Sequence, residues 1–194
     1  FDEFLIYPNF KNAPINSLIN VKTDDVLTAL MIDFYATDYS ALDGSVFPTT
    51  SDELFQAYPA HDKAPFIQVK KFDEHNNSAV YTNLTRQRLS DKVNLEGFAS
   101  QKGVVFRNTQ RYLATGLHAS SGKHDFKNMF LAHFKYTTSF EEKVNHEVKR
   151  SEHWNNAEEY KIYAANTLRF LNCFGEDHSM IFDPDLGLLT SNKK

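Results

Sequence analysis

The sequence predicts a mixed α/β fold, in which a mixed sheet carries flanking helices. The first observation is a nearly continuous apolar run at 26–35 (VLTALMIDFY), whose β-branched and aromatic residues are typical of a strand buried on both faces. The second is a change in the hydrophobic period, from two to about 3.6, near residue 139. Strands should therefore precede this point, and a helical pair at about 139–171 should end the chain.

Composition limits the class of protein. The 194 residues are 41% hydrophobic and 24% charged, as in ordinary globular proteins, and we expect 1–194 to form a single domain or a domain fragment. The net charge of -4 gives no basic surface for nucleic acid. No apolar run approaches the roughly 20 residues that cross a bilayer. The single cysteine favours a reducing compartment.

Alternation and turn residues predict the elements before residue 139. A short helix should begin at Ser51, which is its expected cap, after the exposed connection 36–50 with its Asp, Ser, Gly and Pro residues. The other strand candidates are apolar or alternating runs between polar turns, and they lie at 4–7, 65–72, 79–84, 104–106, 110–114 and 129–136.

Two amphipathic helices should follow. The first runs to about Arg150 and starts with Ser139 and Glu142, which have the spacing of a capping box. The second should be capped by Asn156. Its apolar stripe consists of Tyr160, Tyr163, Ala164, Leu168 and Leu171.

Carboxylates and histidines are the candidate chemical groups. Asp2 and Glu3 stand before a strand, where an acid pair can hold a divalent cation against a diphosphate, although such pairs are more often solvated turns. His133 lies inside an apolar strand, where an imidazole either is satisfied within the core or points into a site. Asp33, near the end of the buried strand, is a candidate general base, and Asp73 is the second choice.

Basic residues and one loop histidine complete the candidates. Arg86 and Arg88 share a face and suit a diphosphate or carboxylate, but an exposed arginine pair is commonly solvated surface. His118 lies in the Gly/Ser-rich loop 116–122, which could approach a ligand closely. Nothing in the sequence matches a nucleophilic triad, a phosphate-binding glycine loop or a zinc finger.

Several segments, taken in order, resemble the bacterial family 2-like glycosyltransferases. They are Asp-Glu-Phe-Leu-Ile-Tyr-Pro at 2–8, Ile-Asp-Phe-Tyr at 32–35, Thr-Arg-Gln-Arg-Leu at 85–89, Gly-Leu-His-Ala at 116–119, His-Phe-Lys-Tyr at 133–136, Glu-His-Trp at 152–154 and Glu-Tyr at 159–160. Phe34, Leu117 and Glu152 depart from the Met, Thr and Gln of that family.

The resemblance implies the GT-A fold and places the chain in its C-terminal, acceptor-side portion. Asp2 matches the second Asp of an Asp-x-Asp-Glu-Phe metal motif, so the first Asp would precede Phe1. The implied activity is transfer of a sugar from a nucleotide-sugar donor to a glycan or other hydroxyl acceptor, in cell-surface polysaccharide biosynthesis. The implied location is the cytoplasm or the inner face of the membrane.

The resemblance also implies roles for the candidate residues. Mn²⁺ or Mg²⁺ would be held by Asp2 and by His133 or, as the second choice, His118. The leaving diphosphate would be bound by Arg86, Arg88 and Lys135, and the acceptor hydroxyl would be deprotonated by Asp33 or Asp73.

Two other functions remain open from the residues. The chain could be a non-catalytic carbohydrate-binding or scaffolding domain that uses its aromatic surfaces, including Trp154. It could also be a metal-dependent phosphoesterase, which would need a second metal-binding cluster that the sequence does not reveal.

Overall fold

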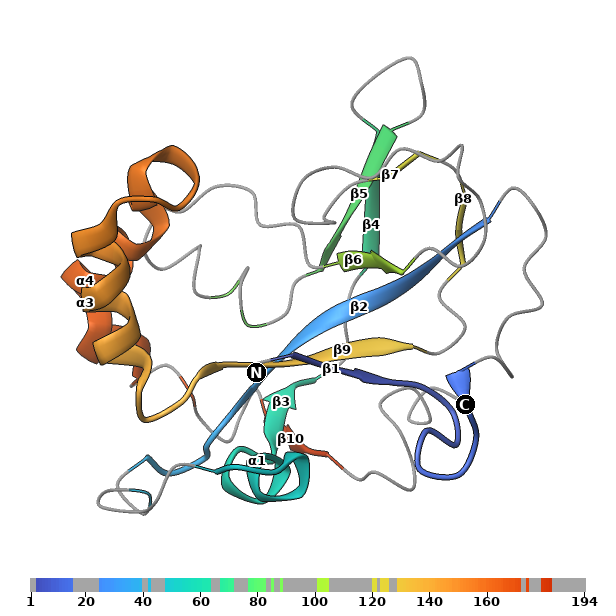
Figure 1. Cartoon of the computed structure of the whole chain (residues 1–194), viewed down its shortest axis with the longest axis horizontal. Helices are drawn as coiled ribbons and strands as arrows, with labels where there is room; N and C mark the ends of the chain where they lie inside the picture. The colour runs from blue at the N-terminus through green and yellow to red at the C-terminus, as the bar shows by residue number, and fades with distance from the viewer. Residues whose placement is uncertain are drawn as a thin grey trace.

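A computed structural model describes residues 3–15, 25–39, 42, 48–63, 67–71, 77–82, 85, 88, 101–104, 120–121, 123–125, 129–171, 174 and 179–182. Within these residues the fold is mixed α/β, with two sheets and three helices. Figure 1 shows the larger sheet in the middle of the molecule and the helices α3 and α4 together at one side of it. None of the described helices combines the length and apolarity needed to cross a bilayer.

The larger sheet is mixed, as predicted. Its main order is β1-β9-β2-β3-β10, and β6 and β8 pair with the first half of β2. β2 runs parallel to β9 and β8 but antiparallel to β3 and β6. These strands are β1 (Glu3–Ile6), β2 (Asp25–Tyr35), β3 (Ala60–Asp62), β6 (Gln101–Val104), β8 (Lys123–Asp125), β9 (Phe130–Tyr136) and β10 (Ser179–Ile181).

The smaller sheet contains β4 (Ile67–Lys71), β5 (Asn77–Thr82) and β7 (Ser120–Ser121). β4 and β5 form an antiparallel pair, which confirms the strands predicted at 65–72 and 79–84. The strand candidate 104–106 is described only at its first residue, where β6 ends. The candidate 110–114 lies outside the described residues.

Helix α1 (Ser51–Ala57) is present, but its predicted cap is wrong by one residue. The cap is Thr50, whose extended backbone leaves its hydroxyl free to accept the N–H of Glu53 at 3.2 Å. The Glu53 carboxylate accepts in return from the N–H of Thr50 at 3.1 Å, which completes a capping box. Hydrogen bonds from the backbone and side chain of Thr49, together with those from Thr50, lower the pKa of this exposed carboxyl.

The helical pair consists of α3 (Phe140–Arg150) and α4 (Trp154–Leu171). The predicted capping box of α3 is wrong, because Ser139 makes no side-chain cap bond and its hydroxyl instead pairs with that of Thr137 at 3.0 Å. Asn156 does not have the extended backbone of an N-cap either. It lies inside α4 with a φ of 54°, a left-handed conformation that asparagine tolerates better than most residues.

Two further predictions about the helical pair need correction. Ala164 is exposed and leaves the predicted stripe, whereas Tyr160 and Tyr163 are buried. The helices also do not end the fold, because β10 follows them and pairs with β3. A three-residue strand is too short to show a clear period in the sequence.

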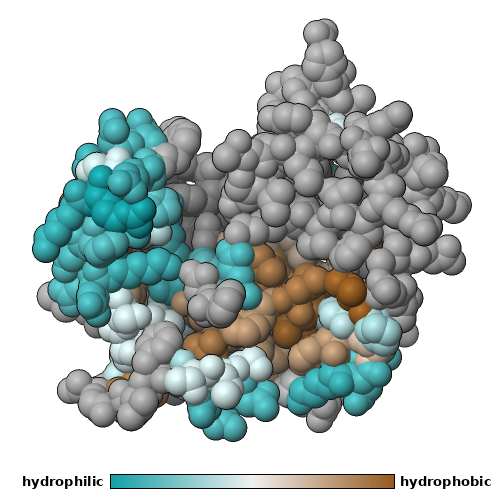
Figure 2. All heavy atoms as spheres, viewed as in Figure 1, coloured by the Kyte–Doolittle hydropathy of each residue, from teal (hydrophilic) through white to brown (hydrophobic). Residues whose placement is uncertain are grey.

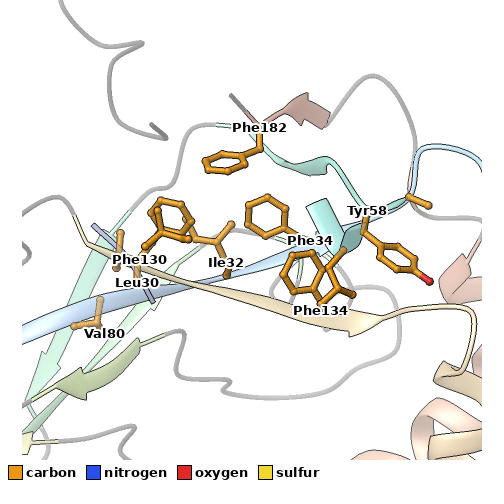
Figure 3. Packing of buried hydrophobic residues seen from close by; sticks show 12 residues of the cluster. Leu30, Ile32, Phe34, Tyr58, Val80, Phe130, Phe134 and Phe182 are labelled. Carbon is orange, nitrogen blue, oxygen red and sulfur yellow. The ribbon is translucent and has the colours of Figure 1, made fainter. Parts of the chain in front are cut away.

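An aromatic cluster lies on the face of β2 and β9 that carries their even-numbered residues. Figure 3 shows Phe34, Phe130, Phe134 and Phe182 gathered beside these strands. The ring of Phe34 contacts the other three, with centroids 5.4 to 6.4 Å apart. Each buried phenylalanine contributes about 1.5–3 kcal/mol from removal of apolar area from water. This cluster is therefore a main source of the stability of the sheet.

On one face of the protein, hydrophilic and hydrophobic residues lie over different elements. Figure 2 shows a hydrophilic outer surface on the helical pair and hydrophobic residues gathered over the β1, β9 and β2 region. On the other face of the sheet from the aromatic cluster, Leu5 and Leu131 are partly buried against Leu27, Ala29 and Met129.

Candidate functional site

A row of polar residues crosses one face of the larger sheet. The strand register places Glu3 of β1 opposite His133 of β9, and His133 beside Asp33 of β2. Paired residues on neighbouring strands share a face, and successive residues alternate between faces. The row therefore lies on the opposite face from the aromatic cluster, whose members on β2 and β9 have even numbers.

His133 and Asp33 form a buried pair. Nδ1 of the imidazole lies 2.5 Å from Oδ1 of the carboxylate, and the two residues are only 5% and 2% exposed. An ionised carboxylate can only accept hydrogen bonds, so the ring donates its Nδ1–H to Asp33. This bond sets the orientation and tautomer of the ring, as carboxylates do for metal-ligating and general-base histidines.

A second acid, Asp62, ends β3, whose antiparallel register with β2 pairs His61 with Phe34 and Ala60 with Tyr35. Arg88 donates from Nε and Nη2 to the two carboxylate oxygens of Asp62, at 3.0 and 2.7 Å. The hydroxyl of Tyr35 donates to the same acid at 2.6 Å. A bidentate arginine and a phenol therefore satisfy a carboxylate that is almost fully buried.

Lys135 is the third basic residue of this region, and it lies at a bulge in β9. Asp33 pairs with His133, but Tyr35 pairs with Tyr136, so β9 has one more residue than β2 over this stretch. Such a bulge leaves two residues of one strand opposite a single residue of its partner and redirects a side chain. The side chain of Lys135 extends to α4, where it contacts Tyr163.

Helix α4 supplies the partners of Lys135. Its ammonium group donates to the carboxylate of Glu159 and, at 3.2 Å, to the hydroxyl of Tyr163, which itself donates to Glu159 at 2.6 Å. The ammonium nitrogen also lies 4.5 Å from the ring centroid of Tyr163 and 5.5 Å from that of Tyr160. These contacts attach α4 to β9.

The three pairs form a region that we call the polar band, which contains Asp33, Asp62, Arg88, His133, Lys135 and Glu159. Each acid in the band has a basic partner from another element. Pairing is needed because an isolated charge would be costly at such depth. Since buried titratable groups collect at functional sites more often than elsewhere, the polar band is the candidate site.

The structure places half of the residues that were predicted from sequence to act in a site. Asp33, His133, Arg88 and Lys135 are all members of the polar band. The remaining predicted residues lie outside the described part of the chain; they are Asp2, Asp73, Arg86 and His118. Their predicted roles remain predictions.

The described residues supply part of a possible donor set for a metal. Among the described residues, no three His, Cys, Asp or Glu side chains come close enough together to hold an ion. His133 nevertheless has the carboxylate partner that a metal-ligating histidine usually has. The described part thus supplies one suitable ligand, and further ligands would have to come from residues such as Asp2, outside that part.

The sequence does not single out Asp62, Glu159 or Tyr163 as site residues, although Tyr163 belongs to the predicted apolar stripe of the second helix. Asp62 belongs to a three-residue strand that gives no periodic signal. Glu159 and Tyr163 had a detectable relation, because residues four apart lie on the same helical face. Their pairing with Lys135 nevertheless depends on how α4 docks, which helical spacing alone does not specify.

Two other histidines are held by different contacts. His124 lies between two hydroxyls, with Nδ1 2.8 Å from Thr28 Oγ1 and Nε2 2.8 Å from Ser78 Oγ, and so connects β8, β2 and β5. Burial lowers its pKa. His61 packs against Phe34 in the aromatic cluster, and burial lowers its pKa despite the opposing effect of Asp62. Both are better explained as structural residues than as ligands.

Comparison with protein-family models, with curated proteins and with solved structures gives no match for this chain. No family is therefore assigned, and the resemblance to glycosyltransferases remains a prediction from the residues that carry it.

Proposed function

We propose that this protein is a metal-dependent glycosyltransferase that moves a sugar from a nucleotide-sugar donor to a hydroxyl of a glycan or other acceptor. The observation that supports this proposal most is the buried Asp33–His133 pair within the polar band. The mixed sheet is compatible with a GT-A-like arrangement, which is part of the proposal. A reducing, cytoplasmic location is also part of it, because Cys173 is the single cysteine of the chain.

The pair suggests separate roles for its two members. His133 would present its Nε2 to the metal or substrate, and Asp33 would hold the ring in the required tautomer. His133, together with Asp2, would hold Mn²⁺ or Mg²⁺, which supplies Lewis-acid stabilisation of phosphate oxygens when bound. In this scheme Asp33 acts through His133, which differs from its predicted role as the base that contacts the acceptor.

The basic residues would contribute electrostatically. A leaving nucleoside diphosphate carries negative charge that preorganised cations can stabilise. Lys135 follows His133 by two residues on β9 and is therefore a nearby cation for that charge. Arg88 is held in a bidentate pair with Asp62, so its proposed contribution is to keep that acid neutralised within the band.

The test is nucleoside diphosphate release from a panel of nucleotide sugars and saccharide acceptors by the full-length protein, with Mn²⁺ or Mg²⁺. We expect His133→Ala to reduce turnover by about 10²- to 10⁴-fold and Asp33→Asn to reduce it by about 10- to 100-fold. The control is His146→Ala, because His146 is an exposed histidine on α3 outside the polar band. Chelation should abolish turnover.

Other results would contradict the proposal. Unchanged turnover in folded His133→Ala protein would show that His133 takes no part in the reaction. Saccharide binding that survives chelation, without breakdown of any nucleotide sugar, would instead support a carbohydrate-binding domain. Hydrolysis of simple phosphate esters without sugar transfer would support a phosphoesterase.

A further inference from the structure

Arg88 and Lys135, the arginine and the lysine of the polar band, are held in different ways. Arg88 is 13% exposed at its side chain and makes two hydrogen bonds to Asp62, which is 6% exposed and also bonded to Tyr35. A planar guanidinium in a bidentate pair has little freedom to change partners. Separation of this pair would also leave a deeply buried acid without its cation.

Lys135 is bound by a more exposed acid. The lysine side chain is 6% exposed, whereas that of Glu159 is 29% exposed. Glu159 accepts a second hydrogen bond from Tyr163, at 2.6 Å, which does not depend on the lysine. Loss of the ammonium contact would therefore leave this acid with a hydrogen-bond donor and access to water, so its desolvation cost would be small.

The lysine itself can exchange partners at low cost. An ammonium group is a point charge on a flexible stem and does not require the fixed geometry of a fork. The ring of Tyr163, 4.5 Å from the ammonium nitrogen, provides a favourable surface for the cation while its partner changes. Lys135 also follows His133 by two residues on β9.

We infer that Lys135 is an exchangeable phosphate-binding cation and that Glu159 is the internal acid that competes with the ligand for it. The ligand class is a phosphate or diphosphate anion. This inference deepens the proposed function and rests on it for the identity of the diphosphate. Glu159 is then a positioning residue: it keeps Lys135 in place in the empty site and yields it when the anion binds beside His133.

The test is titration of the full-length protein with inorganic pyrophosphate in the absence of metal and nucleotide. Binding is measured by isothermal titration calorimetry. We expect Glu159→Gln to bind pyrophosphate about tenfold more tightly than the wild type, because a charged competitor has been removed. Lys135→Met should lose about tenfold or more of the affinity. The single tryptophan, Trp154, lies at the start of α4 and offers a second, fluorescent readout.

Glu158→Gln is the matched control. Glu158 precedes Glu159 on the same helix, is exposed and carries the same charge, but it bonds to Asn155 rather than to Lys135. If both substitutions raise the affinity equally, net charge explains the effect and the inference is overturned. A gain confined to Glu159→Gln supports it, since structural damage to the site would weaken binding instead.

Further outcomes separate this inference from the proposed function. If the wild type and Glu159→Gln both fail to bind pyrophosphate at millimolar concentration, the inference that Lys135 is an exchangeable phosphate-binding cation is overturned. If sugar transfer is present but Glu159→Gln does not strengthen pyrophosphate binding, the proposed glycosyltransferase function stands. The inference that Glu159 competes with the anion for Lys135 is then overturned. If transfer is absent but the selective gain occurs, the anion site stands without glycosyl transfer. Should Lys135→Met unfold, the Lys135→Gln/Glu159→Gln double variant replaces it and must lose the gain.

Discussion

The two faces of β2 and β9 come from alternating residues of the same strands but have opposite character. The even-numbered face is an apolar cluster around Phe34, in which ring contacts and burial stabilise the sheet. The other face carries Asp33, His133 and Lys135 between two smaller apolar clusters. Because paired buried charges contribute little net stability compared with apolar residues, we expect the even-numbered face to stabilise the sheet more than the polar face does.

Phe34→Ala should have the largest effect on stability. Phe34 is fully buried among other rings, so truncation removes apolar contacts and leaves a cavity. We expect a loss of about 3–5 kcal/mol in the free energy of unfolding, measured with urea. Val69→Ala is the control, because Val69 is 46% exposed on β4, and it should cost less than about 0.5 kcal/mol. A cost below about 1 kcal/mol for Phe34→Ala would show that the even face is not the main core.

Substitutions of Asp62 and Arg88 test how much this ion pair of the polar face contributes to stability. Asp62→Leu alone should destabilise the protein by about 3 kcal/mol, because it leaves a largely buried arginine without its acid. Adding Arg88→Met should restore stability to within about 1 kcal/mol of the wild type, since a matched apolar pair can replace buried charges. Urea unfolding of the four proteins in this cycle gives the coupling. Strictly additive losses would mean that the two side chains do not stabilise each other.

The smallest expected effect is a dependence of stability on pH. It comes from His61, which packs on the apolar face. Its ordinary pKa is 6.5, and burial lowers the pKa in the folded protein. Below pH 6.5 the unfolded chain therefore binds this proton more readily, so stability is full above that pH and falls as the pH decreases toward the folded pKa. The slope for one histidine is at most about 1.4 kcal/mol per pH unit.

Urea unfolding at pH 7.5 and at pH 6.0 measures this slope, as two points about 1.5 units apart on the linkage curve. His61→Gln should lessen the loss of stability between the two conditions, and His124→Gln should lessen it further, because burial lowers the pKa of His124 as well. An unchanged loss in both variants would assign the acid sensitivity to other groups.

Much of the fold could be predicted, because local composition specifies it. The apolar run at 26–35 became the central strand β2, and the change of period near residue 139 marked the start of the helical pair. The missed elements are short: β3, β7, β8 and β10 contain three residues or fewer. Such segments owe their conformation to the strands beside them and show no period of their own.

The helix caps show where local patterns fail. Ser51 and Ser139 both had suitable side chains in suitable places, yet neither caps its helix. A cap depends on the backbone angles of the residue, and these are set by how the preceding chain enters the helix. Thr50 had the extended backbone and Glu53 at the right spacing, so it took the role at α1.

The amino-acid sequence shows which chemical groups are available, and it singles out His133 within an apolar strand and Asp33 near the end of another as candidate site residues. Tertiary structure decided that they are partners of each other, because the parallel register of β2 and β9 places residues 100 positions apart side by side. It likewise decided that Lys135 meets Glu159, through the docking of α4 against β9. Alternation is a local property that a sequence displays, whereas register and docking follow from packing of the whole chain.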